Sequence, residues 1–116
     1  MTTARRSTRQ RGREGERRAR LYYRLRGYRV LGANVWAGGN EVDLIVRRGR
    51  RVVFVEVKDK AGERYGDPLE MVDDEKLRRV ERAAEAWLAA HPAEGDLEYA
   101  VEVVAVRGSR VERIEV

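Results

Sequence analysis

The chain contains no cysteine, and its 116 residues include only one histidine and one phenylalanine. Without cysteine, neither a disulfide framework nor a thiolate metal site is available, which fits a reducing cytosol. No apolar run is long enough to cross a bilayer, and the N-terminal stretch MTTARRSTRQ lacks the apolar core of a signal peptide. We therefore expect a cytoplasmic protein that does not contact membranes.

Lysine is also scarce, because 22 of the 25 basic residues are arginine. The only lysines are Lys58, Lys60 and Lys76. An arginine stays protonated, whereas the pKa of a lysine shifts readily, so a lysine retained in such a chain suggests a chemical role. Genome composition is the alternative explanation. Lys60 and Lys76 are candidate nucleic-acid contacts, and for Lys76 a simple solvated side chain is equally open.

Charge is distributed unevenly along the chain. Residues 1–29 hold eleven arginines against two glutamates, a net charge of +9 that leaves −4 for residues 30–116. Such a basic segment is typical of proteins that bind polyanions, with a solvated charged helix face as the alternative. The candidate nucleic-acid-binding residues here are Arg11, Arg13, Arg17 and Arg18.

The length of the chain predicts one domain with a single modest core. We expect residues 1–9 to be a disordered basic arm and residues 10–116 to be the domain. Apolar periodicity and turn residues predict a mixed sheet flanked by helices, an α/β fold of order αβββαββ. The expected elements are a helix over 11–26 ended by Gly27, a strand over 28–36, a hairpin over 40–58, a helix from Asp67-Pro68 to His91-Pro92, and a hairpin about Gly108-Ser109.

The hairpin over 40–58 carries the most informative pattern. Gly49-Arg50 suits a type II′ turn, and that turn pairs Asp43 with Glu56 and Glu41 with Lys58. Alternation places these four charged side chains together at one end of one face. The valines and the leucine on the opposite face are predicted to form the core.

Two carboxylates facing each other destabilise a sheet unless something compensates them. A divalent cation would do so, because Mg²⁺ is held by one or two carboxylates together with waters and phosphate oxygens. With Mg²⁺ (or Mn²⁺) on Asp43 and Glu56, and Lys58 beside them, the predicted chemistry is phosphodiester hydrolysis. Glu16, on the first helix, is a further catalytic and metal-ligand candidate. The alternative is a plain salt bridge between Glu56 and Lys58.

Five stretches of the sequence also resemble a known family: GREGERRA at 12–19, NEVDLI at 40–45, VFVEVK at 53–58, YGDPLEMVDDEK at 65–76 and VEVVAV at 101–106. Together they resemble the successive motifs of the YraN family of small bacterial proteins. The resemblance implies a restriction-endonuclease-like fold of the PD-(D/E)xK nuclease type, close to archaeal Holliday junction resolvases. It covers roughly residues 10–116.

Carried over by position, the resemblance makes Asp43 the motif aspartate, Glu56 the second acid, Lys58 the motif lysine and Glu16 the helix glutamate. It also implies a homodimer acting on branched DNA. The sequence departs from the family pattern at three places. These are Asn40 in place of glycine, Lys60 in place of arginine, and Ala100-Val101-Glu102 in place of Arg-Phe-Asp.

Three functions compete on the sequence alone. The first is a Mg²⁺-dependent endonuclease acting on DNA, and the second is a non-catalytic nucleic-acid-binding module on a nuclease scaffold. The third is a protein-interaction domain with a basic docking segment. Among the remaining residues, His91 is expected to be a helix cap or solvated and Trp87 to be core, while Trp36 is open between core and surface.

Overall fold

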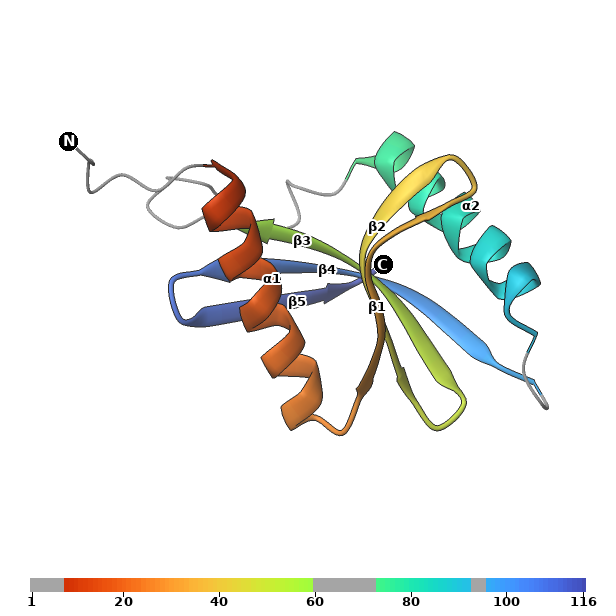
Figure 1. Cartoon of the computed structure of the whole chain (residues 1–116), viewed down its shortest axis with the longest axis horizontal. Helices are drawn as coiled ribbons and strands as arrows, with labels where there is room; N and C mark the ends of the chain where they lie inside the picture. Colours follow the sequence, from red (N-terminus) through yellow and green to blue (C-terminus); the bar gives the residue numbers. More distant parts are fainter. Residues whose placement is uncertain (1–7, 60–72, 93–95) are drawn as a thin grey trace.

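Within the residues that the structure describes, two helices and five strands follow one another in the order αβββαββ that the sequence predicts (Figure 1). The computed structural model describes residues 8–59, 73–92 and 96–116. Its elements are α1 (Thr8–Leu25), β1 (Arg29–Ala37), β2 (Asn40–Arg48), β3 (Arg51–Asp59), α2 (Asp74–Ala90), β4 (Glu98–Arg107) and β5 (Arg110–Glu115). α1 thus begins within the segment predicted to be an arm. The predicted helix start at Asp67-Pro68 lies outside the described residues. α2 as described begins at Asp74, with Asp73 as its N-cap.

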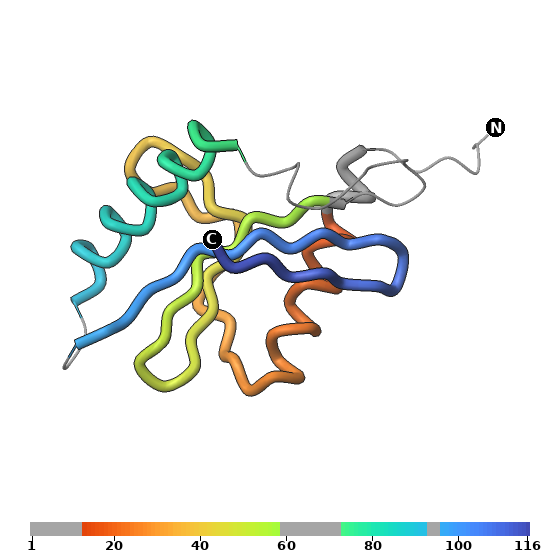
Figure 2. Tube along the Cα trace, turned by 180° about the vertical axis from the view of Figure 1, so that it is seen from behind, coloured from red at the N-terminus to blue at the C-terminus, as the bar shows by residue number. Residues whose placement is uncertain are grey.

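The five strands form one mixed sheet in the order β1-β2-β3-β4-β5. Only β3 and β4 run parallel, and the other neighbours are antiparallel. A parallel pair needs a long crossover connection, and α2 lies in that connection. Figure 2 shows from behind how β4 and β5 cross the molecule between the two helices.

Each helix covers one face of the sheet, so the core has two halves. Ala19 and Tyr23 of α1 pack on one face, and Ala83 and Ala84 of α2 pack on the other. Alternate residues of β3 serve the two halves: Val53 and Val55 face α1, and Val52 and Phe54 face α2.

The sequence predicted one core face for the β2–β3 hairpin and a second face that becomes polar at one end, and the structure shows that the second face also contributes to the core. Ile45 and Phe54, on the face expected to turn polar, are fully buried beneath α2. Central strands that are covered on both sides need near-continuous apolar runs, which is why VVFV in β3 shows no polar alternation. The polar part of this face is therefore confined to the strand ends.

α1 is an arginine-rich helix anchored by very few apolar side chains. Ala19 and Tyr23 are buried, whereas Leu25 is 74% exposed. Gly27 ends the helix as predicted, with a φ of +86°. Its amide donates to the Arg24 carbonyl and that of Tyr28 to the Tyr23 carbonyl, which is a Schellman motif. Neither described helix combines the length and apolar character needed to cross a bilayer.

The tight turns of the sheet are built on glycines. Gly49 has a φ of +59° and is followed by Arg50 at negative φ, the combination of a II′ turn, so the predicted turn is confirmed. Gly108 likewise joins β4 to β5. At the β1–β2 turn, a Cβ on Gly38 would lie 2.9 Å from the Arg82 carbonyl oxygen, so this hairpin is in backbone contact with α2.

Candidate active site

The candidate site lies where β2 and β3 separate. Their paired residues run from Arg48↔Arg51 to Leu44↔Val55, in the predicted register, and the ladder ends there. The predicted pairs of Asp43 with Glu56 and of Glu41 with Lys58 are therefore wrong as ladder pairs. Instead, the Asp43 side chain accepts a hydrogen bond from the Val57 amide at 2.8 Å. The Asp43 carboxylate thus replaces a backbone carbonyl as the acceptor for the Val57 amide, at the point where the two strands separate.

Asp43 occupies an unfavourable environment for a charged carboxylate. Burial, followed by the negative charge of Glu56, raises the pKa of Asp43 from 3.8 to about 7. Glu16 and Glu41 raise this pKa further, and the hydrogen bond from Val57 opposes the shift. The pKa of Asp43 is thus influenced by three other carboxylates, which come from α1, β2 and β3.

Glu56 is flanked by two lysines. Its Oε1 lies 2.8 Å from Nζ of Lys76 and 3.5 Å from Nζ of Lys58, and only 13% of its side chain is exposed. The sequence left two roles open for Lys76, a phosphate contact or a solvated side chain. In the structure Lys76 forms the shorter of the two ion pairs with Glu56. Burial and the neighbouring Lys76 lower the pKa of Lys58. For Lys76 burial acts in the same downward direction, yet contact with Glu56 raises its pKa overall.

Glu16 is held by Asn34, a residue that no sequence pattern singled out. The side-chain amide of Asn34 on β1 donates to Oε1 of Glu16 at 3.1 Å. Asn34 has a φ of +52°, a left-handed conformation that asparagine tolerates better than most residues. A local asparagine in a strand carries no signal of such a long-range contact, so only the structure reveals it.

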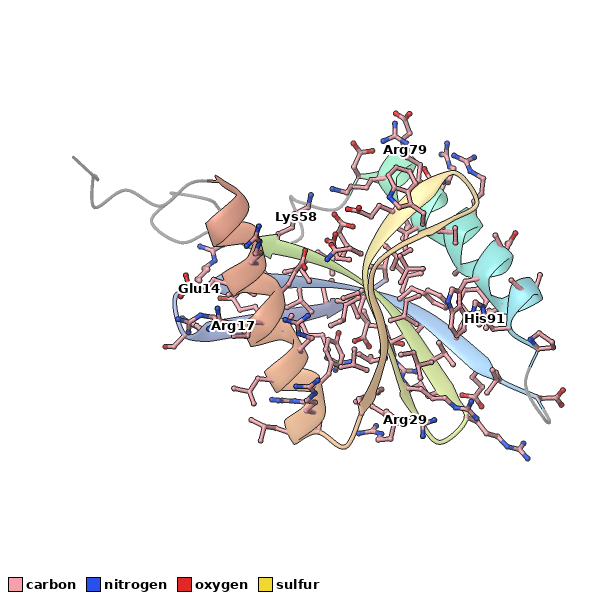
Figure 3. The ribbon with its side chains drawn as sticks, in the orientation of Figure 1. Glu14, Arg17, Arg29, Lys58, Arg79 and His91 are labelled. Atoms are coloured by element: carbon pink, nitrogen blue, oxygen red, sulfur yellow. The ribbon has the colours of Figure 1, made fainter. Side chains whose placement is uncertain are left out.

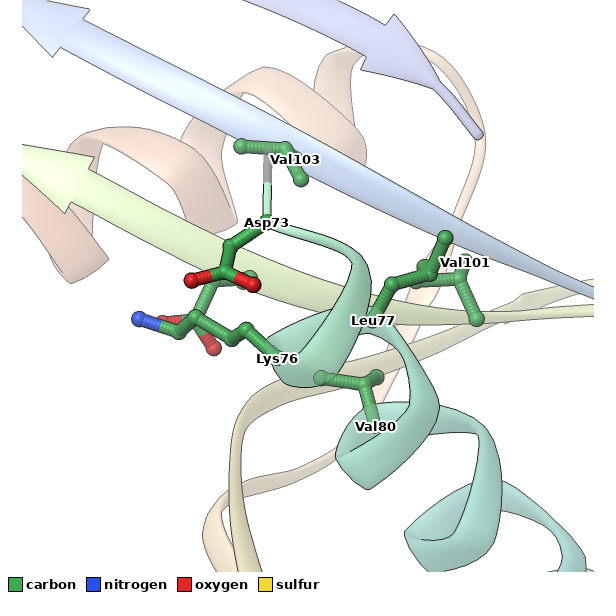
Figure 4. A pocket seen from close by; sticks show the side chains of 7 residues that line it. Asp73, Lys76, Leu77, Val80, Val101 and Val103 are labelled. Carbon is green, nitrogen blue, oxygen red and sulfur yellow. The ribbon is translucent and has the colours of Figure 1, made fainter. Parts of the chain in front are cut away.

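A small cavity adjoins Glu56 on the α2 side. It has a volume of about 10 Å³, enough for a single water molecule, and Asp73 and Lys76 extend to the same side of it (Figure 4). Its other walls are apolar and come from α2 and β4: Leu77, Val80, Val101 and Val103. Apolar walls of this kind limit water access to Glu56 and strengthen its ion pair with Lys76.

Asp43 and Glu56 offer oxygen ligands of the kind that Mg²⁺ and Mn²⁺ prefer. Two protein carboxylates are sufficient for Mg²⁺, which completes its shell with waters and substrate phosphate oxygens. Across the described ranges, no group of three or more acidic, histidine or cysteine side chains is arranged to hold one ion. The donor set therefore fits a two-carboxylate site, and Glu16 as a further ligand stays a prediction.

The predicted arginine contacts lie on α1, and Lys76 lies in the first turn of α2. Arg13 and Arg17 are exposed, and Arg18 is half-buried. Figure 3 shows Arg17 on the outer side of α1 and Lys58 at the end of β3, at the opposite end of the molecule from Arg29. The side chain of Arg11, and Lys60 altogether, lie outside the described residues.

The aromatic and histidine predictions have clear outcomes. Trp36 is 70% exposed and pairs across the β1–β2 hairpin with Glu41, close to the acids. Trp87 is half-buried and packs edge-to-face on Phe54, which confirms that it belongs to the core. His91 is the C-cap of α2, as expected, and its ring stacks on Trp87.

Fold and site together define an α/β protein with a five-stranded mixed sheet that presents two partly buried carboxylates and two lysines at a strand fork. Residues 15–114 match the uncharacterised protein family UPF0102. The chain belongs to this family, which includes the YraN proteins, as the sequence motifs predicted.

Relatives within the family share a third to a half of their residues with the chain. A UPF0102 protein of Halorhodospira halophila is 44% identical over 90 residues, which is 78% of this chain and 74% of the relative. One from Methylorubrum extorquens is 49% identical over 88 residues, or 76% of this chain and 67% of the relative. The UPF0102 protein YraN of Escherichia coli is 37% identical over 110 residues, or 94% of this chain and 84% of the relative.

Proposed function

We propose that this protein is a Mg²⁺-dependent endonuclease that hydrolyses phosphodiester bonds of DNA on a restriction-endonuclease-like core. The observation that carries the proposal is the pair Asp43 and Glu56. Burial and mutual repulsion raise the pKa of Asp43 to about 7, a cost with no structural benefit unless a cation relieves it. Branched DNA as substrate and a homodimer as the active form belong to the same proposal.

Each side chain of the site has a role in this chemistry. Asp43 and Glu56 would hold the ion, which when bound supplies Lewis-acid polarisation of a phosphate and a lowered pKa for water. Lys58, partly buried beside Glu56, is placed to stabilise the charge that grows on the phosphate during attack. Asn34 fixes Glu16 so that its carboxylate adds to the negative field around Asp43.

A second function is favoured by one specific contact. Lys76 already neutralises Glu56 at 2.8 Å, in the manner of a site that needs no metal. A non-catalytic nucleic-acid-binding module would keep this arrangement and use the basic α1 to bind backbone phosphates. Such a module gives salt-sensitive binding without product and without dependence on a divalent ion.

Cleavage of a labelled four-way DNA junction with Mg²⁺ or Mn²⁺ separates the two functions. The parent protein is expected to nick the junction, and Asp43→Ala and Glu56→Ala are expected to abolish nicking while binding is retained. Glu85→Ala, an exposed acid on α2, is the matched control and should cleave like the parent.

Equal cleavage by the Asp43 and Glu56 variants would identify a contaminating nuclease. Titration with Mn²⁺ in a calorimeter gives an independent readout, because the site requires an ion whose binding is lost in Asp43→Ala. Binding of the junction by the parent without heat of Mn²⁺ binding and without product would establish the non-catalytic module.

A further inference from the structure

A second cavity, lined by polar side chains, lies at the C-terminal end of α1, away from the acids of the candidate active site. Its volume is about 170 Å³, room for far more than one water molecule. Three tyrosines, three arginines and one glutamate line it: Tyr22, Tyr23, Tyr28, Arg26, Arg48, Arg113 and Glu102. None of these residues belongs to the candidate active site.

The single carboxylate of this cavity is already fully engaged. Glu102 has no exposed surface, and its Oε1 accepts a hydrogen bond from the Tyr23 hydroxyl at 2.6 Å. Its Oε2 accepts from Arg51 at 3.0 Å and from Arg113 at 2.8 Å. Both guanidiniums also lie near Glu115, at 3.1 Å from Arg51 and 3.7 Å from Arg113. Glu102 is therefore occupied by Tyr23, Arg51 and Arg113, and it makes no ion pair with Arg26 or Arg48 in the described residues.

Arg26 and Arg48 are held in place by neutral groups alone. The Arg26 guanidinium lies 3.5 Å from the centre of the Tyr22 ring and donates to the Tyr22 carbonyl. That of Arg48 lies 4.5 Å from the centre of the Tyr28 ring and donates to the Arg26 carbonyl. Within the part of the chain that the structure describes, neither guanidinium is paired with a carboxylate.

Two fixed guanidiniums with donors to spare, beside a cavity whose only acid is neutralised, are suited to an anion. Arginine forks bind phosphate oxygens with two parallel hydrogen bonds, and stacking on tyrosine removes much of the entropy cost of ordering them. We infer that this cavity, between the C-terminal end of α1 and strands β2, β4 and β5, binds a phosphate group through Arg26 and Arg48. The inference does not depend on hydrolysis at Asp43.

Titration of the parent protein with inorganic phosphate tests the site directly. The side-chain Nε–Hε NMR signals of Arg26 and Arg48 are expected to shift and saturate, and those of Arg24 and Arg50 to stay in place. Arg24 and Arg50 are matched controls, because each is exposed, lies two residues from a cavity arginine and does not line the cavity. Shifts that do not saturate, or that spread equally over the control arginines, would overturn the site.

Substitutions of the two arginines test how much each contributes to the affinity for phosphate. Arg26→Gln and Arg48→Gln are each expected to weaken phosphate binding about tenfold, the scale of one lost charge-assisted hydrogen bond. Arg24→Gln and Arg50→Gln remove the same charge and should change it less than twofold. If the control variants lose as much phosphate affinity as the cavity variants, the loss comes from the net charge of the protein, and the inference is contradicted. If a cavity variant does not fold, the NMR titration of the parent protein with phosphate still tests the inference.

The same signals distinguish a phosphate on a nucleic-acid chain from a free one. A short single-stranded oligonucleotide without terminal phosphates is added in place of inorganic phosphate. If the cavity takes a backbone phosphate, the oligonucleotide shifts Arg26 and Arg48 and inorganic phosphate competes with it. If the cavity takes a small free phosphate, only inorganic phosphate shifts them. Absence of both responses would show that the cavity is not an anion site.

Discussion

The side chain of Asp43 makes a hydrogen bond that stabilises the fold, but it carries a charge that its surroundings disfavour. Its carboxylate accepts the Val57 amide in the fork between β2 and β3, which an uncharged acceptor could do equally well. Its charge, by contrast, is disfavoured by burial and by the neighbouring Glu56. The hydrogen bond serves the fold, and the charge is needed only if the site binds a cation.

The raised pKa of Asp43 makes stability depend on pH. Because the folded-state pKa of about 7 lies above the ordinary value of 3.8, the folded protein binds an extra proton between these two pH values. This group therefore causes stability to fall as pH rises from about 4 to 7, and above pH 7 the full penalty remains.

Asp43→Asn is expected to remove this penalty while it keeps an acceptor for Val57. At pH 8 the variant should be more stable than the parent by on the order of 2 kcal/mol, and the gap should shrink toward zero near pH 4. Urea unfolding at pH 4, 6 and 8 measures the gap. Asp96→Asn, an exposed carboxylate ahead of β4, should show no such trend. A gap for Asp43→Asn that is independent of pH would contradict this account.

At the scale of elements, the sequence predicted the order of helices and strands, the hairpin register and its turn. These follow from local signals: glycine at positions of positive φ, and short apolar runs between them. Asp67-Pro68, which local rules favour as a helix start, lies outside the described residues, so that prediction is not tested. Asp73 meets the same rules, and its side chain accepts from the Glu75 amide at 2.9 Å.

The candidate site was predicted in its residues but not in its geometry. Alternation along two strands brought Asp43, Glu56 and Lys58 to one end of the hairpin. It could not show that the ladder ends at Leu44↔Val55, because the fork depends on a side chain replacing a backbone acceptor. Contacts that join distant elements, such as those of Asn34 and Lys76, leave no periodic signal in a single sequence.

The contact between the β1–β2 turn and α2 is testable with two neighbouring glycines. Gly38 and Gly39 both have positive φ, but only at Gly38 would a Cβ meet backbone, 2.9 Å from the Arg82 carbonyl oxygen. Gly39→Ala is expected to cost about 1 kcal/mol for its φ alone, and Gly38→Ala at least about 1 kcal/mol more. Urea unfolding of both variants gives the comparison. Equal costs would mean that the turn does not rest on α2.

At the scale of the whole molecule, Glu102 joins four elements through one buried carboxylate. Tyr23 comes from α1, Arg51 from β3 and Arg113 from β5, and all three donate to Glu102 on β4. Arg51 also reaches Glu115 at 3.1 Å, which secures the edge strand. The late motif position that departs from the family pattern is therefore a structural centre in this chain.

The loss in free energy of unfolding should depend on whether Glu102 or its arginine partners are replaced. Glu102→Gln removes the buried charge and leaves two arginines that are partly exposed, so a loss of about 2 kcal/mol is expected. Arg51→Met with Arg113→Met leaves the buried carboxylate unpaired and should cost about 3–5 kcal/mol. Urea unfolding at pH 8 compares them. A smaller loss for the double variant than for Glu102→Gln would contradict a charged, buried Glu102.

α1 spans the two polar regions of the molecule as one unbroken element. Glu16, at the middle of α1, lies beside the acidic fork, and Arg26, just beyond the end of the helix, lines the tyrosine-lined cavity. Ten residues of helix set an axial spacing of about 15 Å between them. If the protein acts on DNA as proposed, a duplex backbone lying along α1 would meet Arg26 about four base-pair steps from the acids.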